Sequence, residues 1–183
     1  MGFAIAGELV SRGALVILIC GPVTLEIHHP SIQRFDVSSA DEMYEVCLEH
    51  FPVCDGAIMT AAVADYTPVI SQTEKIKRSE GNLHIELRPN RDIAAELGKI
   101  KRTDQFLIGF ALESQNEMEN AALKLKRKNL DMIVLNSLKE PGAGFGYDTN
   151  KISILTRKGQ IFNYPLKSKQ EVAVDIVDRM LEF

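Results

Sequence analysis

The chain has 183 residues, of which 45% are hydrophobic and 25% charged. These values are ordinary for a globular protein and exclude disordered, collagen-like and disulfide-scaffold classes, and the length predicts one domain rather than two. The formal net charge of −4 provides no global basic field for nucleic acid or an anionic membrane, so any phosphate ligand must be held by a local site.

The apolar runs of the chain are short. The longest, at residues 14–19 and 57–64, fall far below the roughly 20 residues that span a bilayer. The chain also does not open with the charged and apolar pattern of a signal peptide. We therefore expect a cytoplasmic protein with no membrane partner.

The predicted elements alternate between helices and strands. Helical periodicity predicts helices over residues 3–13, 39–50, 92–99, 117–128 and 169–181. Short apolar runs predict strands over residues 14–20, 56–60, 106–110 and 132–135. The continuous run at 14–20 is typical of a strand buried on both faces of a parallel sheet. The alternation predicts a three-layer α/β fold, Rossmann-like or ribokinase-like, with a mostly parallel sheet and helices on both faces.

Three segments depart from this alternation. Residues 83–87 alternate apolar and polar side chains, which predicts a half-exposed strand outside the main sheet. Residues 152–155 and 160–162 predict an antiparallel hairpin at a sheet edge. The first helix begins without a capping residue or a preceding strand, so we expect an upstream strand and loop that this chain does not contain.

Ligands of open α/β sheets bind at the carboxyl ends of the strands. Small residues follow the predicted strand that ends near Met59 and Thr60, and they would let a planar base approach the backbone. Asp65 then offers a carboxylate to a ribose hydroxyl or a metal. On composition alone, tight helix-to-strand packing with Asp65 as a cap is the favoured explanation of the same residues.

Four further positions bear candidate chemistry. Lys75 lies in a polar stretch from which a mobile lysine can close over phosphates, although most such charge runs are solvated faces. Asn90 is placed to cap a helix whose first amides can bind an anion or merely begin a helix. Lys124 and Lys128 are one helical turn apart, which suits a polyphosphate or simply complements the helix dipole.

Familiar nucleotide-binding and hydrolase motifs are absent from the sequence. The chain has neither a strand-linked GxGxxG nor a GxxxxGK[ST] segment, and it has neither a GxSxG elbow nor an HExxH pair. The missing glycine fingerprint weighs against a nicotinamide-dependent oxidoreductase. A nucleotide site here must rest on other residues.

Five segments in order resemble one known family. They are Ala61–Tyr66 (AAVADY), Lys75–Lys77 (KIK), Asn90–Ile93 (NRDI), Gly109–Glu113 (GFALE), and Lys124 and Lys128 followed by Asp131 and Asn136. Each is weak alone, but their joint order resembles bacterial phosphopantothenoylcysteine synthetase, the ligase half of the bifunctional flavoprotein of coenzyme A synthesis. The segment from Phe145 to Asn150 (FGYDTN) fits as well.

The resemblance implies a ligase that uses CTP as co-substrate and Mg²⁺ as cofactor. The carboxylate of 4′-phosphopantothenate would attack the α-phosphate of CTP, and the amine of cysteine would then displace CMP from the acyl-cytidylate. The family pattern also implies a homodimer, a flavin-dependent decarboxylase domain upstream, and no flavin in this chain. A non-catalytic nucleotide-binding module of the same fold remains the alternative.

The resemblance also assigns residue roles. Lys75 would be the catalytic lysine and would contact CTP as well. The remaining CTP-binding residues would be Met59, Thr60, Ala61, Asp65, Arg91, Asp92, Ile93, Ala94, Phe110, Lys124 and Lys128. Mg²⁺ would be held mainly through the CTP phosphates, so no metal ligand is assigned among the side chains. The single domain would cover residues 1–183, with a dimerisation arm at about 67–88.

Two features depart from the family pattern. Arg91 stands where the family usually has proline between asparagine and aspartate. The family's opening strand and Gly-rich loop, which carries an asparagine needed for the second half-reaction, precede the position of Met1 and are not in this chain. We therefore expect an N-terminally incomplete domain, and the sequence leaves open whether this chain is active by itself.

Overall fold

The computed structural model describes residues 1–70, 74–77, 82–112, 117–136 and 146–182. The helices are α1 (Gly2–Ser11), α2 (Ala40–His50), α3 (Ile93–Ile100), α4 (Glu117–Arg127) and α5 (Lys169–Met180), with a short 3₁₀ turn at Phe51–Val53. The strands are β1 (Val16–Cys20), β2 (Ile32–Asp36), β3 (Gly56–Met59), β4 (Tyr66–Pro68), β5 (Leu87–Pro89), β6 (Phe106–Leu112), β7 (Met132–Asn136), β8 (Thr149–Asn150), β9 (Ile152–Thr156), β10 (Ile161–Asn163) and β11 (Lys167–Ser168).

The central sheet has five strands in the order β10-β9-β7-β6-β3. Strands β3, β6 and β7 run parallel, so their carboxyl ends meet at one edge of the sheet. Strands β9 and β10 are antiparallel and form the hairpin predicted at the sheet edge. This edge hairpin ends the parallel part of the sheet on the side away from β3.

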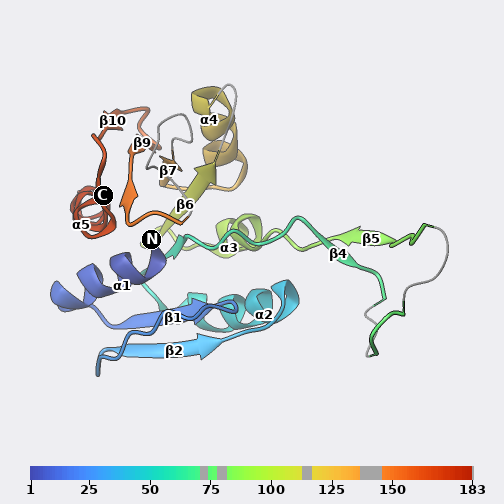
Figure 1. Cartoon of the computed structure of the whole chain (residues 1–183). Coiled ribbons are helices and arrows are strands. Elements are labelled where there is room, and N and C mark those ends of the chain that lie inside the picture. The colour runs from blue at the N-terminus through green and yellow to red at the C-terminus, as the bar shows by residue number, and fades with distance from the viewer. Residues whose placement is uncertain (71–73, 78–81, 113–116, 137–145, 183) are drawn as a thin grey trace.

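Helices cover both faces of this sheet (Figure 1). On one face, Ile5 of α1 and Ile176 of α5 pack with Ile108 and Val134 of the sheet. On the other face, the apolar sides of α2, α3 and α4 pack with alternate sheet residues such as Leu107. The predicted three-layer α/β fold is therefore confirmed. None of the described helices is both long and apolar enough to cross a membrane.

Strands β1 and β2 form a separate two-stranded parallel sheet. The prediction that residues 14–20 are buried on both faces is wrong, because only Cys20 of β1 is buried and Leu15, just before it, is 87% exposed. Strand β2 was not predicted from the sequence. It is only five residues long, and Gln33 and Arg34 interrupt its apolar residues.

A long arm projects from the body between β3 and α3 (Figure 1). It carries the antiparallel pair β4–β5, in which Thr67 lies opposite Arg88. The strand predicted at residues 83–87 is wrong in position, because the ladder is confined to Leu87–Pro89 on that side. Of the predicted arm at 67–88, residues 71–73 and 78–81 lie outside the described residues.

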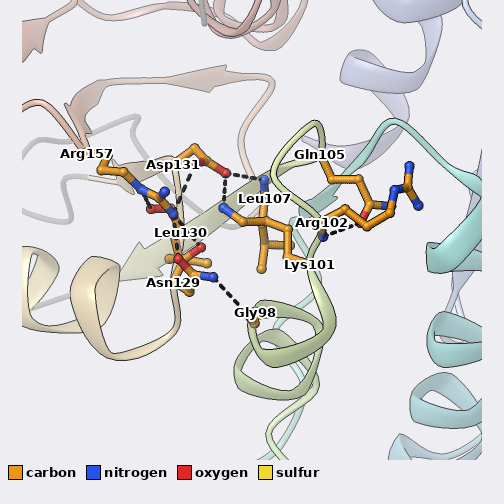
Figure 2. A network of polar contacts seen from close by, with 9 residues as sticks. All are labelled: Gly98, Lys101, Arg102, Gln105, Leu107, Asn129, Leu130, Asp131 and Arg157. Atoms are coloured by element: carbon orange, nitrogen blue, oxygen red, sulfur yellow. Dashed lines mark hydrogen bonds and ion pairs between the residues drawn. The ribbon is translucent and has the colours of Figure 1, made fainter.

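A polar network fastens the amino-terminal ends of β6 and β7 (Figure 2). Asp131 Oδ2 accepts from the Leu107 N–H at 2.8 Å and from Lys101 Nζ at 2.5 Å. The Arg157 guanidinium reaches Asp131 Oδ1 at 3.1 Å from the β9–β10 turn. Lys101 follows α3 directly, so the network holds α3 and the edge hairpin at fixed positions on the sheet.

Candidate functional site

Asn90 joins the loop after β3 to the loop before α3. Its backbone N–H donates to the Asp65 carbonyl at 2.8 Å, and its Nδ2 donates to the Ala64 carbonyl at 2.8 Å. The prediction that Asn90 caps the following helix is wrong, because its Nδ2 bond directs the side chain toward the loop after β3. Its Oδ1 is buried without a partner in the described part of the chain.

Asp92 is the residue that caps α3. Its backbone is extended and its Oδ1 accepts from the Ala95 N–H at 3.1 Å, which satisfies one of the free amides of the first turn. The same oxygen lies 3.0 Å from Lys128 Nζ. A carboxylate, a cation and the N-terminus of a helix therefore meet at one point beyond the sheet edge.

Lys128 is placed by close packing between α3 and the end of α4. The Lys128 N–H donates to the Lys124 carbonyl at 2.9 Å, which adds it to the last turn of α4. Gly98 allows the approach, since a Cβ there would lie 2.0 Å from the Lys128 carbonyl oxygen. Asn129 Nδ2 donates to the Gly98 carbonyl at 2.7 Å. Lys124 is half-buried on the same turn.

Arg91 turns away from this point toward α2. Its guanidinium stacks on the Tyr44 ring at 3.7 Å and pairs with Glu45 at 2.7 Å and Asp41 at 3.2 Å. Arg88 and then Arg91 hydrogen-bond the Asp41 carboxylate and lower its pKa. The Arg91 side chain is therefore engaged by α2 and is not directed at a ligand beside Asp92.

The other residues predicted to bind CTP are divided between the faces of the sheet. Met59 packs toward α2, α3 and α4, whereas Phe110 packs toward α1 and α5. Thr60 lies against the start of α1, because a Cβ at Gly2 would come 2.7 Å from its Oγ1. A ligand that meets all three would have to lie across the end of the sheet.

Four more predicted residues differ sharply in exposure. Ile93 is 5% exposed and belongs to the core, so only its backbone is available to a ligand. Ala61 and Asp65 are exposed in the loop after β3, and Ala94 is half-buried in the first turn of α3. Asp65 is thus an exposed carboxylate in the loop that follows β3.

Lys75 is exposed and lies on the arm, between β4 and β5. No contact between described residues joins Lys75 to Asp92 or Lys128, so the described part of the chain does not bring the predicted catalytic lysine to the residues predicted to hold phosphate. Glu113 and Phe145, which belong to the recognised segments, lie outside the described residues. Within the described ranges, no group of three or more His, Cys, Asp or Glu side chains is arranged to hold a metal ion.

Known proteins resemble this chain over its whole length. A coenzyme A biosynthesis bifunctional protein CoaBC from Bacillus subtilis is 42% identical over 180 residues, covering 98% of this chain and 44% of that protein. A cysteine/cysteine sulfinic acid decarboxylase from an unknown prokaryotic organism is 54% identical over 181 residues, covering 99% of this chain and 50% of that protein. The chain thus spans about half the length of these curated relatives.

The fold has a close counterpart among solved structures. The crystal structure of the C-terminal domain of CoaBC superposes with a TM-score of 0.81 at 36% identity, covering 99% of this chain and 82% of the other. The family model for the DNA/pantothenate metabolism flavoprotein C-terminal domain matches residues 1–183. The chain therefore belongs to the DNA/pantothenate metabolism flavoprotein C-terminal domain family.

Proposed function

We propose that this chain is the ligase part of a coenzyme A biosynthesis enzyme and joins 4′-phosphopantothenate to cysteine at the expense of CTP. A carboxylate oxygen of the pantothenate forms a bond to the α-phosphorus of CTP as the bond to pyrophosphate breaks. The cysteine amine then bonds to the acyl carbon, CMP leaves, and the amine loses a proton. Support comes from family membership and from whole-chain identity to CoaBC proteins.

One observation supports the nucleotide site best: the Lys128 ammonium lies beside Asp92 at the start of α3. Lys128 Nζ is held 3.0 Å from Asp92 Oδ1, beside the free amides of a helix N-terminus. A cation and helix amides together favour an anion, since both place positive charge at the same point. The Asp92 carboxylate is the anion there in the unliganded chain, and a phosphate would compete with it for Lys128. The triphosphate of CTP is the anion that this proposal places there, with Lys124 from the same turn of α4.

The protein groups around that point fit a nucleotide with bound Mg²⁺. Mg²⁺ usually keeps several waters and binds through substrate phosphates and one or two carboxylates, and the exposed Asp65 is available for that role. When bound, the ion neutralises phosphate charge and favours departure of pyrophosphate. Positioning of the carboxylate against the α-phosphate supplies much of the remaining rate.

In this proposal, residues on both faces of the central sheet contact the base and ribose of CTP. Thr60 and Phe110 lie on the side of α1 and α5, where the Phe110 ring can flank the base. Met59 and Ala61 belong to the end of β3 and the loop after it, and Asp65 is also close to a ribose hydroxyl in this proposal. Residues Arg91 to Ala94 contribute backbone amides.

The exposed arm supports a homodimer. In this dimer, Lys75 of one chain would complete the nucleotide site of the other chain. Large apolar side chains of the arm are exposed: Tyr66, Val69, Ile70, Ile76, Leu83, Ile85 and Leu87. A two-stranded ribbon alone is marginally stable in water, so a second surface that covers these side chains would stabilise it. In this proposal the second surface belongs to another copy of the chain.

Hydroxylamine trapping tests the first half-reaction apart from the second. The chain is incubated with CTP, Mg²⁺, 4′-phosphopantothenate and hydroxylamine, and CMP and the pantothenoyl hydroxamate are measured. Two control reactions accompany it. One contains ATP in place of CTP, and the other contains CTP but no phosphopantothenate. Equal amounts of CMP and hydroxamate support the acyl-cytidylate. CTP binding without CMP, in a protein extended by its native upstream residues, would instead identify a non-catalytic nucleotide-binding module.

The decarboxylase name of one relative provides a second candidate function. That protein is 54% identical, but this chain covers only half of it, so the named activity can reside in either half. Release of CO₂ from cysteine or cysteine sulfinic acid in the absence of nucleotide would support decarboxylation by this chain. Product formation that requires CTP would support the ligase.

A further inference from the structure

Arg91 lies in the short stretch between the arm and α3, and its side chain is attached to α2. The guanidinium carbon lies 3.7 Å from the centre of the Tyr44 ring, and the nitrogens pair with Glu45 at 2.7 Å and Asp41 at 3.2 Å. Asp41 also pairs with Arg88 of β5 at 2.7 Å. Two arginines at the base of the arm therefore contact the first half of α2.

The Tyr44 ring is the part of this contact that can hold Arg91 most firmly. The side chains of Asp41 and Glu45 are 42% and 66% exposed, and exposed ion pairs contribute little to stability. Tyr44 is half-buried and packs against the core beneath α2, so its ring has a fixed position. A guanidinium that stacks on such a ring gains both cation–π attraction and contact area.

The residues on either side of Arg91 are attached to other parts of the fold. Asn90 is bonded to the loop after β3, and Asp92 caps α3. The N–H groups of Ile93 and Ala94 follow directly, and neither has a hydrogen-bond partner among the described residues, as is usual in the first turn of a helix. The attachment of residues 90–92 therefore decides where these two amides lie.

We propose that Arg91 is a positioning residue for the nucleotide. Its guanidinium, stacked on Tyr44, holds residues 90–92 against α2 and thereby places the Ile93 and Ala94 amides where CTP phosphates can accept from them. The inference rests on the proposed ligase function. It assigns Arg91 a role through the backbone that follows it, with no contact between its side chain and the ligand.

Loss of the stack should appear as a loss of CTP affinity. Without it, residues 90–92 occupy the binding position for only part of the time, and the apparent affinity falls in proportion to that fraction. We expect Arg91→Ala to weaken CTP with Mg²⁺ about fivefold, the size of one partly exposed cation–π contact. Calorimetry of the whole chain measures this change.

Two further substitutions of Arg91 distinguish positioning from direct contact. Arg91→Pro restrains the backbone by its ring, and the Arg91 N–H has no described partner to lose, so CTP affinity should stay within about twofold of the unaltered chain. Arg91→Lys keeps the charge but stacks less well, so it should bind CTP nearly as weakly as Arg91→Ala. A side chain that bound phosphate directly would give the reverse order, with lysine better than proline.

The partner ring provides a second test of the same contact. Tyr44→Phe keeps the stacking face and should leave CTP affinity unchanged, whereas Tyr44→Leu should weaken it as Arg91→Ala does. Combining Tyr44→Leu with Arg91→Ala should weaken CTP no more than either change alone, because both remove one interaction.

Arg179→Ala is the matched control for a purely structural effect. Arg179 also stacks at 3.7 Å on an aromatic ring, that of Phe162 on β10, at the opposite end of the central sheet from β3. This variant should lose thermal stability and keep its CTP affinity. An equal loss of affinity in the Arg179 and Arg91 variants would overturn the inference.

The remaining outcomes separate this inference from the proposed function. If the unaltered chain binds CTP and Arg91→Ala binds it equally well, the positioning role is wrong and the nucleotide site stands. Equal losses in Arg91→Ala and Arg91→Pro would also overturn the positioning role. If the unaltered chain does not bind CTP, the proposed function and the role of Arg91 fail together.

Discussion

Lys128 Nζ and Asp92 Oδ1 lie 3.0 Å apart and join the end of α4 to the start of α3. The Asp92 oxygen has a second donor, the Ala95 N–H of the first turn of α3. One carboxylate thus caps a helix and fixes a lysine. Removal of either partner should therefore have a distinct consequence, on ligand affinity for the lysine and on stability for the aspartate.

Lys128→Ala should weaken CTP binding about ten- to hundredfold, because a hydrogen bond to a charged phosphate is worth about 1.5–3 kcal/mol. Calorimetry with CTP and Mg²⁺ measures the change. The matched control is Lys126→Ala, which removes an exposed lysine of the same helix that lies outside the candidate site. Equal affinity in the Lys128 and Lys126 variants would place the triphosphate elsewhere.

Asp92→Ala should destabilise the protein by about 1 kcal/mol relative to Asp92→Asn, because asparagine caps a helix as well as aspartate does. Urea denaturation of both variants gives the difference in free energy of unfolding. Asp92→Asn removes the negative charge beside Lys128 but keeps a capping side chain, so it separates the effect of the charge from the effect of the cap. A difference near zero would show that the Ala95 N–H finds water or another acceptor.

The helices and the parallel strands of the central sheet were predictable because their signals are local. Apolar periodicity indicates a helix wherever it occurs, and Ser39, which accepts from the Glu42 N–H, marks the start of α2 in the sequence itself. Asn90 and Asp92 are both good capping residues, so the sequence does not distinguish them. The difference is tertiary, because the β3 loop provides carbonyls that engage Asn90.

The directions in which the candidate site residues point were not predictable from the sequence. Arg91 follows from the recognised motif, whereas its stacking on Tyr44 depends on how α2 lies beside the loop before α3. Burial of Asn150 likewise depends on the pairing of β8 with β11 and on α1 nearby. Contacts between segments far apart in the chain carry no sequence signal of their own.

Lys101→Met should destabilise the protein by about 3 kcal/mol, because it leaves the half-buried Asp131 carboxylate without its main cation. The Lys101 side chain is only 5% exposed and lies 2.5 Å from Asp131 Oδ2 (Figure 2). Urea denaturation measures the loss. Lys158→Met in the exposed β9–β10 turn is the control, and adding Asp131→Asn to Lys101→Met should recover part of the stability. No recovery would mean that Lys101 acts through packing alone.

Cys47 should make the stability depend on pH in the alkaline range. Burial raises the pKa of the Cys47 thiol from 9.0 to about 11, so the folded state favours the neutral thiol. Its contribution is complete below about pH 9 and is lost as the pH rises toward 11. Cys47→Ala should flatten the fall of the urea midpoint over this interval. An unchanged slope would assign the alkaline loss to other groups.

If the arm forms the proposed homodimer, Ile85→Glu should convert it to a monomer, because a charge would be buried in place of an apolar contact between copies. Ile85 is 59% exposed in the single chain, so the change should not affect folding of the body. Sedimentation velocity over a range of protein concentrations measures the assembly. The matched control is Leu15→Glu, which charges another exposed apolar residue before β1, away from the arm. If the unaltered chain dimerises and both variants remain dimers, the interface lies away from Ile85. If Leu15→Glu alone gives monomers, then the copies pair through the β1–β2 side, and Lys75 must reach the site of its own chain.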